Sequence, residues 1–361
     1  MKSFFLVPLR TERYSRVPER APRTRRSLLT IFCLLLTAHC TLPTVFAASW
    51  SRQHTSSLAW LHAVYFVDSN RGWAVGSRGT LLSTQDSGKS WQAKPQPTED
   101  VIRDIYFSDE LHGSLLCERN IFELKSNDEQ RAYLMLTSDG GEHWRRASLR
   151  GADVDARLMR ALFSRGGRGW AFGEGGMIYA TDDSGASWTR LQAPTRFLLL
   201  GGDFIDENSG WLVGAGGTIL QTSDGGQTWQ KGILPAATGV RFNSASFVDL
   251  RRGWAVGSDG AIYHTVNGGR SWQAQVSGVT ADLLDVKFLD AAEGWAVGAE
   301  GTLLHTADGG LHWLSERSNT PHALERIFFA DRAHGWAVGF GGTIISYGSA
   351  NARTEAPRLR R

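Results

Sequence analysis

Six turns in this 361-residue chain carry an acidic or amide side chain in one context, Thr-x-Asp/Asn-x-Gly-x-x-Trp, the Asp-box pattern. A carboxylate held in a turn can serve as a general acid, a general base or a metal ligand. Six nearly identical copies cannot all share one catalytic role, and Asp or Asn here accepts backbone N–H groups of its own turn. We therefore predict a structural role for these residues. They are Asp86, Asp139, Asp183, Asp224, Asn267 and Asp308.

Glycoside hydrolysis is the alternative chemistry, because Asp boxes also occur in sialidases and other propeller glycosidases. Such enzymes need two facing carboxylates, and Asp104, Asp285 and Glu325 stand where they could face one another. The Phe/Tyr-Arg-Ile-Pro segment of sialidases is absent, and the sixth repeat has no Tyr for the nucleophile. We predict that the chain is not an enzyme. A sialidase-like hydrolase or a carbohydrate-binding module is the alternative.

A set of arginines suits recognition better than catalysis. On a ring that is otherwise acidic, clustered guanidinium groups would bind an acidic or carboxylate-bearing segment of a partner. The alternative is local pairing of each Arg with a neighbour such as Asp104 or Glu325. The candidates near the starts of inner strands are Arg103, Arg160, Arg241 and Arg326, with Arg78 in an adjacent turn.

Metal and cofactor chemistry finds little support. The ten His include no His-x-x-x-His pair, and the Asp-Gly-Gly turns lack the alternating ligands of calcium loops. Two of the three Cys, Cys33 and Cys40, lie in the N-terminal leader, which leaves Cys117 as the remaining thiol. We predict that Cys117 is a small buried side chain and that no cofactor is bound.

A repeat of about 41 residues predicts the strands and turns that position these residues. Each unit has alternating apolar residues ending in Phe, then Gly-Trp-Ala-Val-Gly or a variant, then a third apolar run and the Asp box. With a fourth strand at the Trp, each unit predicts a four-stranded antiparallel sheet. Seven copies predict an all-β fold, a seven-bladed β-propeller. The motif begins at Gly72, Gly113, Gly169, Gly210, Gly253, Gly294 and Gly335.

The seventh unit, from Leu324 to Tyr347, ends after its third strand. Trp50 precedes Phe66 by 16 residues, the same spacing that separates Trp91 from Phe107. We infer that the N-terminal strand around Trp50 supplies the missing fourth strand and closes the ring. Closure would remove sheet edges that otherwise pair with other chains.

The second unit departs from the pattern. Ser114 takes the Trp position, and a charged insertion from Glu118 to Arg131 separates its second and third strands. Insertions in repeats map to loops on one face and often contact partners. A tolerated surface loop is the alternative.

Residues 1–47 predict a secretory signal, because Arg25 and Arg26 precede an apolar run from Leu28 to Leu36 and small residues end the segment. An uncleaved membrane anchor is the alternative. This leader holds eight of the 39 basic and two of the 36 acidic residues, which leaves 31 against 34, or −3. A mildly acidic mature chain argues against nucleic-acid binding. We expect a monomer with a propeller over 48–349 and a basic tail over 350–361.

The combined repeat, seen best in Phe204–Trp229 and Phe288–Trp313, closely resembles the photosystem II stability/assembly factor family. The resemblance covers residues 49 to 347. It implies a seven-bladed propeller exported to the periplasm or thylakoid lumen. It also implies a non-catalytic scaffold that holds a membrane-protein partner, such as a newly made reaction-centre subunit, through a basic patch. Photosystem II itself as the setting depends on a photosynthetic source.

Overall fold

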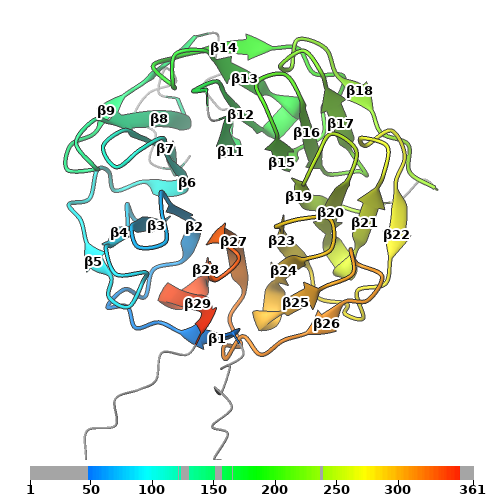
Figure 1. Cartoon of the computed structure of the whole chain (residues 1–361). Coiled ribbons are helices and arrows are strands. Elements are labelled where there is room, and N and C mark those ends of the chain that lie inside the picture. The colour runs from blue at the N-terminus through cyan, green and yellow to red at the C-terminus, as the bar shows by residue number, and fades with distance from the viewer. Residues whose placement is uncertain are drawn as a thin grey trace, which may run out of the picture. The chain divides into compact units, whose positions relative to one another are not determined.

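The computed structural model describes residues 48–120, 122, 130–150, 157–164, 166–235 and 239–349. Over these ranges the strands form seven sheets, arranged as the blades of a ring (Figure 1). The predicted seven-bladed β-propeller is therefore confirmed. The predicted signal segment and basic tail lie outside the described residues. No helix in the described ranges is long and apolar enough to cross a membrane.

Within each blade the strands run outward from the centre of the ring, and their bounds repeat from blade to blade. The inner strands are β2 (Leu61–Phe66), β6 (Val101–Phe107), β11 (Leu158–Phe163), β15 (Leu199–Phe204), β19 (Phe242–Phe247), β23 (Leu283–Phe288) and β27 (Leu324–Asp331). The second strands are β3 (Gly72–Gly76), β7 (Gly113–Glu118), β12 (Gly169–Gly173), β16 (Gly210–Gly214), β20 (Gly253–Gly257), β24 (Gly294–Gly298) and β28 (His334–Gly339).

The outer half of each blade is formed by a third strand and a short fourth strand. The third strands are β4 (Leu81–Thr84), β8 (Ala132–Thr137), β13 (Ile178–Thr181), β17 (Ile219–Thr222), β21 (Ile262–Thr265), β25 (Leu303–Thr306) and β29 (Thr343–Ser349). The fourth strands are β5 (Gln92–Ala93), β9 (Arg145–Arg146), β14 (Ser187–Leu191), β18 (Gln230–Lys231), β22 (Gln273–Gln275), β26 (Leu314–Ser315) and β1 (Ala48–Arg52).

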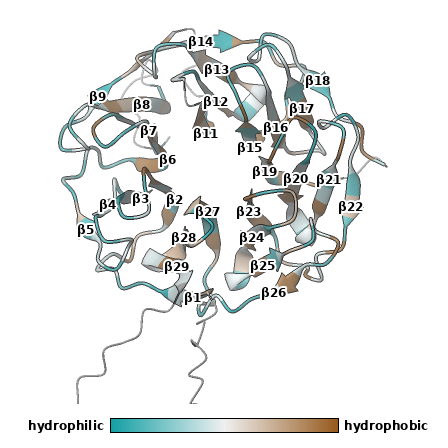
Figure 2. Ribbon diagram, in the orientation of Figure 1, coloured by the Kyte–Doolittle hydropathy of each residue, from teal (hydrophilic) through white to brown (hydrophobic). Residues whose placement is uncertain are grey.

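Tight turns join the second strands to the third. In four blades the turn is a single 3-10 turn: η2 (Glu174–Gly176), η3 (Ser258–Gly260), η4 (Ala299–Gly301) and η5 (Phe340–Gly342). Gly301 shows why the turn ends in glycine: its φ is 71°, and a Cβ there would lie 1.9 Å from the carbonyl oxygen of Thr320. The turn can therefore approach the segment that leads into the next blade. Hydrophilic colour follows the connecting loops in Figure 2, away from the apolar strand interiors.

Five of the seven blades pack on the next through a stacked pair of Trp and Phe rings. The Trp254 indole lies flat on Phe288 of the following blade, with ring centroids 3.5 Å apart and planes 7° apart. A Cβ at Gly253 would lie 2.4 Å from the Phe247 ring, so glycine lets that Phe lie against its own second strand. The same stack joins four other pairs of described blades: Trp73–Phe107, Trp170–Phe204, Trp211–Phe247 and Trp336–Phe66.

Four of these five indoles also bind the Asp-box turn of the next blade. The Trp254 Nε1–H donates to the carbonyl oxygen of Gly309 at 3.0 Å. Trp170, Trp211 and Trp336 make the equivalent bond to the residue after the box Asp or Asn. The Nε1 atoms of Trp73 and Trp295 have no hydrogen-bond partner in the described residues, and for Trp295 the seventh blade has no Asp box to accept the bond. One side chain thus fixes both the packing and the orientation of neighbouring blades.

The seventh blade has the sheet order β1-β29-β28-β27. Strand β1 runs antiparallel to β29, with Trp50 opposite Tyr347. The Trp50 ring meets Phe329 edge-on, at 5.9 Å between centroids, as Trp313 meets Phe288 in the sixth blade.

Two blades differ from the predicted pattern. The third has five strands, because β10 (Ser148–Arg150) adds in parallel to β14 and covers its outer edge. In the second, Glu118 belongs to strand β7 and pairs with Val101 and Ala132. The predicted start of the insertion was therefore wrong, since the β7–β8 hairpin is longer than its counterparts. Residues 121 and 123–129 of the insertion lie outside the described residues.

We predict that Trp254→Ala lowers the free energy of unfolding by about 3–5 kcal/mol, the usual cost of truncating a buried Trp. The variant loses the stack on Phe288 and one of the two donors to the Gly309 carbonyl, which keeps the Gln275 amide at 3.0 Å. Urea titration followed by circular dichroism measures the change. Trp60 is the control, because it lies outside the repeat and is 41 % exposed. Equal losses for Trp254→Ala and Trp60→Ala would contradict the assignment.

Candidate functional site

Every inner strand contains a β-bulge at the same place, four residues before its Phe. The pairing register shifts there in all seven inner strands of the described ring, for example between Leu61 and Ala63 and between Leu324 and Arg326. A bulge re-aims the extra side chain. The bulged residues line one cavity of about 150 Å³ at the channel entrance, together with Arg160 and Arg326. These residues, here called the mouth layer, are His62, Arg103, Met159, Leu200, Asn243, Leu284 and Glu325.

In five inner strands the next residue lines a second layer deeper in the channel: Asp104, Arg160, Ser244, Asp285 and Arg326. A cavity of about 230 Å³ reaches from this layer toward the Asp-box side of the ring. The charged members of this layer are Asp104, Arg160, Asp285 and Arg326. Here they are called the middle layer.

Arg160 bridges the channel. Its guanidinium lies 3.6 Å from Asp104 of the second blade and 3.6 Å from Asp285 of the sixth. Burial is the main influence on Arg160 and lowers its pKa from the ordinary value, with the nearby charge of Arg326 acting in the same direction. The two Asp charges oppose that shift. This local pairing corresponds to the alternative that the sequence left open for the arginines.

The middle-layer carboxylates also join neighbouring blades. Asp104 accepts the backbone N–H of Ala161 in the third blade at 3.2 Å. Asp285 accepts the N–H of Ile327 in the seventh blade at 3.0 Å and the hydroxyl of Ser244 at 2.5 Å. Because both carboxylates bond an Arg and a backbone amide, they are placed as structural acceptors.

Glu325 lies in the mouth layer and has a different environment. Burial raises the pKa of its carboxyl above the usual range, although Arg326 opposes the shift. The Trp60 Nε1–H donates to Glu325 at 3.0 Å. On the same layer, burial and then the charges of Arg103 and Arg326 lower the pKa of His62 to about 3. His62 is therefore neutral at physiological pH and adds no positive charge to the mouth.

Sequence reasoning missed the acidic centre beside this mouth, Glu118. Its carboxylate lies within 2.9 Å of Arg103, Arg131 and Arg157. The charge of Arg103 and Arg157 lowers the Glu118 pKa, although burial acts against them. Three arginines thus surround one buried carboxylate, and Arg131 also lies 3.8 Å from Glu174. The signal available in the sequence was Glu118 itself, which stands directly after the position of the second glycine in the repeat.

Three of the five candidate arginines meet at the mouth: Arg103, Arg160 and Arg326. Arg103 is paired with Glu118 and Arg160 with two Asp, whereas Arg326 has no ion pair among the described residues and its buried Nε has no hydrogen-bond partner there. Arg241 lies beside the mouth, bonded to Asn243 and paired with Asp282 at 2.7 Å. Arg78 occupies the β3–β4 turn with φ 54° and lines neither channel cavity.

The six Asp-box residues lie in turns between third and fourth strands, and they share one hydrogen-bond pattern. In the fourth blade the Asp224 carboxylate accepts the Thr222 hydroxyl at 2.8 Å and the backbone N–H of Thr228 at 2.9 Å. Its other oxygen accepts the Thr228 hydroxyl at 2.5 Å. Asn267 accepts the same kinds of donor in the fifth blade, from Thr265 and Ser271. The remaining members are Asp86, Asp139, Asp183 and Asp308.

Cys117 is fully buried in strand β7, among core residues that include Leu115 and Met135. Burial raises the pKa of its thiol, which disfavours the nucleophilic thiolate. Over the ranges that the structure describes, no group of three or more His, Cys, Asp or Glu is placed to hold a metal ion.

The fold and the channel define an Asp-box β-propeller whose polar entrance is built from seven bulged residues. A family described as photosynthesis system II assembly factor YCF48 matches residues 95–198, 191–277 and 273–348. These segments cover more than half of the chain, which therefore belongs to that family. The resemblance inferred from the repeat is confirmed.

Among individual proteins, the photosystem II assembly lipoprotein Ycf48 of Synechococcus sp. (strain CC9902) is 27 % identical over 124 residues. That segment covers 34 % of this chain and only 34 % of the relative. A solved structure of YCF48 bound to D1 peptide has a TM-score of 0.68 at 20 % identity, covering 83 % of this chain and 96 % of that one. A GH74 xyloglucanase from Xanthomonas campestris has a TM-score of 0.62 at 13 % identity, covering 82 % and 53 %. At these identities both structures are evidence of a shared fold alone.

Hydrogen bonds from the side chain and backbone of Thr228 lower the Asp224 pKa to about 2. The contribution of this Asp box to stability should therefore depend on pH, which can be tested. A folded-state pKa below the usual value of about 4 means that ionised Asp224 stabilises the fold at neutral pH. This contribution is lost as the pH falls from about 4 toward 2. We predict that Asp224→Asn flattens the fall of melting temperature across this window, measured by scanning calorimetry.

The fifth blade provides the matched control. Asn267→Asp introduces a titrating group into the equivalent turn and is expected to steepen the same fall. A pH profile unchanged by both substitutions would rule out the boxes as contributors to acid sensitivity.

Proposed function

We propose that this protein is a non-catalytic assembly factor that binds an acidic or carboxylate-bearing segment of a membrane-protein partner at the channel mouth. Membership of the YCF48 family supports the assembly role. The related propeller bound to D1 peptide supports a peptide segment as the ligand, here a segment of a photosystem II reaction-centre-like subunit. The observation that carries the proposal is Arg326, a guanidinium in the mouth cavity without an ion pair in the described residues.

The charges around Arg326 favour an anionic ligand. Arg160 is committed to Asp104 and Asp285, and Arg103 shares Glu118 with two other arginines. An incoming carboxylate would pair with Arg326 without breaking any of these contacts. Such a charge-assisted bond is stronger than one between neutral groups and is strengthened further by partial burial.

Arg103 and Arg241 are the secondary contacts in this proposal. Arg103 is about one fifth exposed and faces the same cavity as Arg326. Arg241 is nearly half exposed beside Asn243, so exchange of its partner Asp282 for a ligand carboxylate costs little. Arg160 takes a positioning role, because its contacts hold the middle layer together. Arg78 lies away from the mouth cavity and would meet only a longer segment.

We propose no reaction, because the acidic residues of the channel hold neighbouring blades together. Asp104 and Asp285 accept backbone amides of adjacent blades, so their removal would disturb the ring before it disturbed a reaction. The likeness to a GH74 xyloglucanase concerns the fold, at 13 % identity. Turnover of xyloglucan or a sialoside by the purified protein would overturn the non-catalytic assignment.

Export is part of the proposal as well. The leader pattern of residues 1–47 and the lipoprotein name of the Synechococcus relative both support a location in the periplasm or thylakoid lumen. A fusion of the first 60 residues to alkaline phosphatase, which is active only after export, measures this. An intact fusion that stays in the cytoplasmic fraction and shows no phosphatase activity would contradict it.

We predict that Arg326→Glu weakens binding of a D1 peptide at least about tenfold, or ~1.4 kcal/mol, because repulsion replaces the pairing. Isothermal titration calorimetry measures the affinity. A D1 peptide with its acidic groups amidated is expected to lose the same binding free energy toward the wild-type protein. Arg270→Glu is the matched control: it makes the same charge change on the Asp-box face, at an exposed Arg. Equal affinities for the two variants would refute the mouth as the binding site.

A further inference from the structure

The second blade lacks the ring that joins the other blades, and a cleft occupies its place. Ser114 stands where the repeat has Trp, in strand β7. A cavity of about 180 Å³ opens here between the second and third blades. Ser114, Leu136 and Phe163 line it, with Ser184 of the third Asp box at its edge. It lies on the Asp-box side of the ring, away from the mouth layer.

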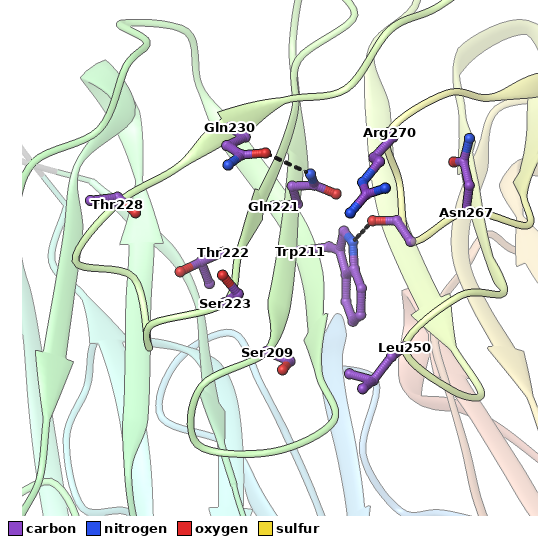
Figure 3. A pocket seen from close by; sticks show the side chains of 11 residues that line it. Ser209, Trp211, Gln221, Thr222, Ser223, Thr228, Gln230, Leu250, Asn267 and Arg270 are labelled. Carbon is purple, nitrogen blue, oxygen red and sulfur yellow. Dashed lines mark hydrogen bonds between the residues drawn. The ribbon is translucent and has the colours of Figure 1, made fainter.

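The equivalent junction between the fourth and fifth blades shows what normally fills this position. In Figure 3 the Trp211 ring stands between the blades, and its N–H points to the carbonyl oxygen of Gly268 at 2.8 Å. The other face of the junction is the Phe247 ring, stacked on Trp211 at 3.6 Å between centroids. Both elements of this receptor, a Phe face and a turn carbonyl, belong to the blade that receives the indole.

The third blade keeps both elements without the indole. The carbonyl oxygen of Ser184, which corresponds to that of Gly268, accepts no hydrogen bond from any residue that the structure describes. The Phe163 ring is covered by Tyr106 at 4.6 Å between centroids, farther than the 3.6 Å of the Trp211 stack. Tyr106 therefore replaces part of the missing contact and leaves the outer part of the cleft open.

We propose that this cleft binds an aromatic side chain carrying an N–H or O–H donor, an indole or a phenol, presented by a partner protein. The ring would pack against Leu136 and the Tyr106–Phe163 pair, and its donor would reach the Ser184 carbonyl. The volume of about 180 Å³ admits one aromatic ring, since about 150 Å³ holds benzene in an apolar cavity. Polar side chains, among them His112, Arg145 and Asp183, line the rest of the cleft. The fold itself indicates the ligand, because four other junctions hold an indole between a Phe face and a turn carbonyl of the same kind.

This site is independent of the proposed function, since it uses none of the five candidate arginines and no residue of the mouth layer, although Tyr106 and Phe163 also line the deeper channel cavity. A partner that engaged both would contact two faces of the ring. Either site can fail its test without affecting the other, because the D1 peptide measurement reads the mouth and the aromatic probe reads the cleft.

The test is a titration of the full exported protein with 5-fluoroindole, followed by fluorine NMR. We expect saturable binding to the wild type. Ser114→Trp, which supplies the missing ring, is expected to weaken binding at least about tenfold and to raise the melting temperature. Ser114→Leu fills the cleft with a smaller side chain and covers the case in which the introduced indole does not fit beside Tyr106.

Gln221→Leu is the matched control. Gln221 occupies in the fourth blade the repeat position that Leu136 occupies in the second, at a junction that already holds its indole. The Gln221→Leu variant should bind 5-fluoroindole with the same affinity as the wild type. Absence of saturable binding to the wild type would overturn the proposal. So would unchanged affinity in a folded Ser114→Trp or Ser114→Leu protein.

Discussion

The stack of a Trp on the Phe of the next blade is the contact on which the rest of this molecule depends. It buries two large rings, and its indole N–H bonds the Asp-box turn of the neighbouring blade, so distance and orientation are set together. The glycine before each Trp is needed because the Phe ring occupies the space of a Cβ. With the blades fixed in this way, the inner strands converge, and their side chains can be used for purposes other than packing.

The channel shows this use. The bulge before each Phe releases one residue per blade from the strand register, and these seven residues form the mouth. The layer beneath is tied by Arg160 and by carboxylates that accept amides of the next blade. The charges are therefore divided between two tasks: Asp104 and Asp285 hold blades together, whereas Arg326 faces the cavity without an ion pair in the described chain. That division separates the recognition surface from the framework.

Much of the fold could be predicted because its determinants are local. Phe, Gly-Trp and the Asp box recur at fixed spacing, and each acts within one blade or on the next. The pairing of Arg160 with Asp285 could not be predicted, because it joins the third blade to the sixth across the channel and depends on the bulges. The acidic role of Glu118 was missed for a related reason: a longer β7–β8 hairpin resembles an insertion when only the sequence is considered. Tyr106 likewise compensates for Ser114 from a different strand.

The repeated bulge has a consequence for how such a protein can change. The bulged residues lie outside the strand register and face a cavity, and none of them belongs to the stacked Trp–Phe pairs, so their replacement leaves those rings in place. The mouth can thus be rewritten, one blade at a time, as seven separately adjustable positions on an unchanged frame. Propellers with the same blades and different mouths would then select different ligands. In such proteins a handful of side chains would determine the ligand, and the remaining residues would determine the fold.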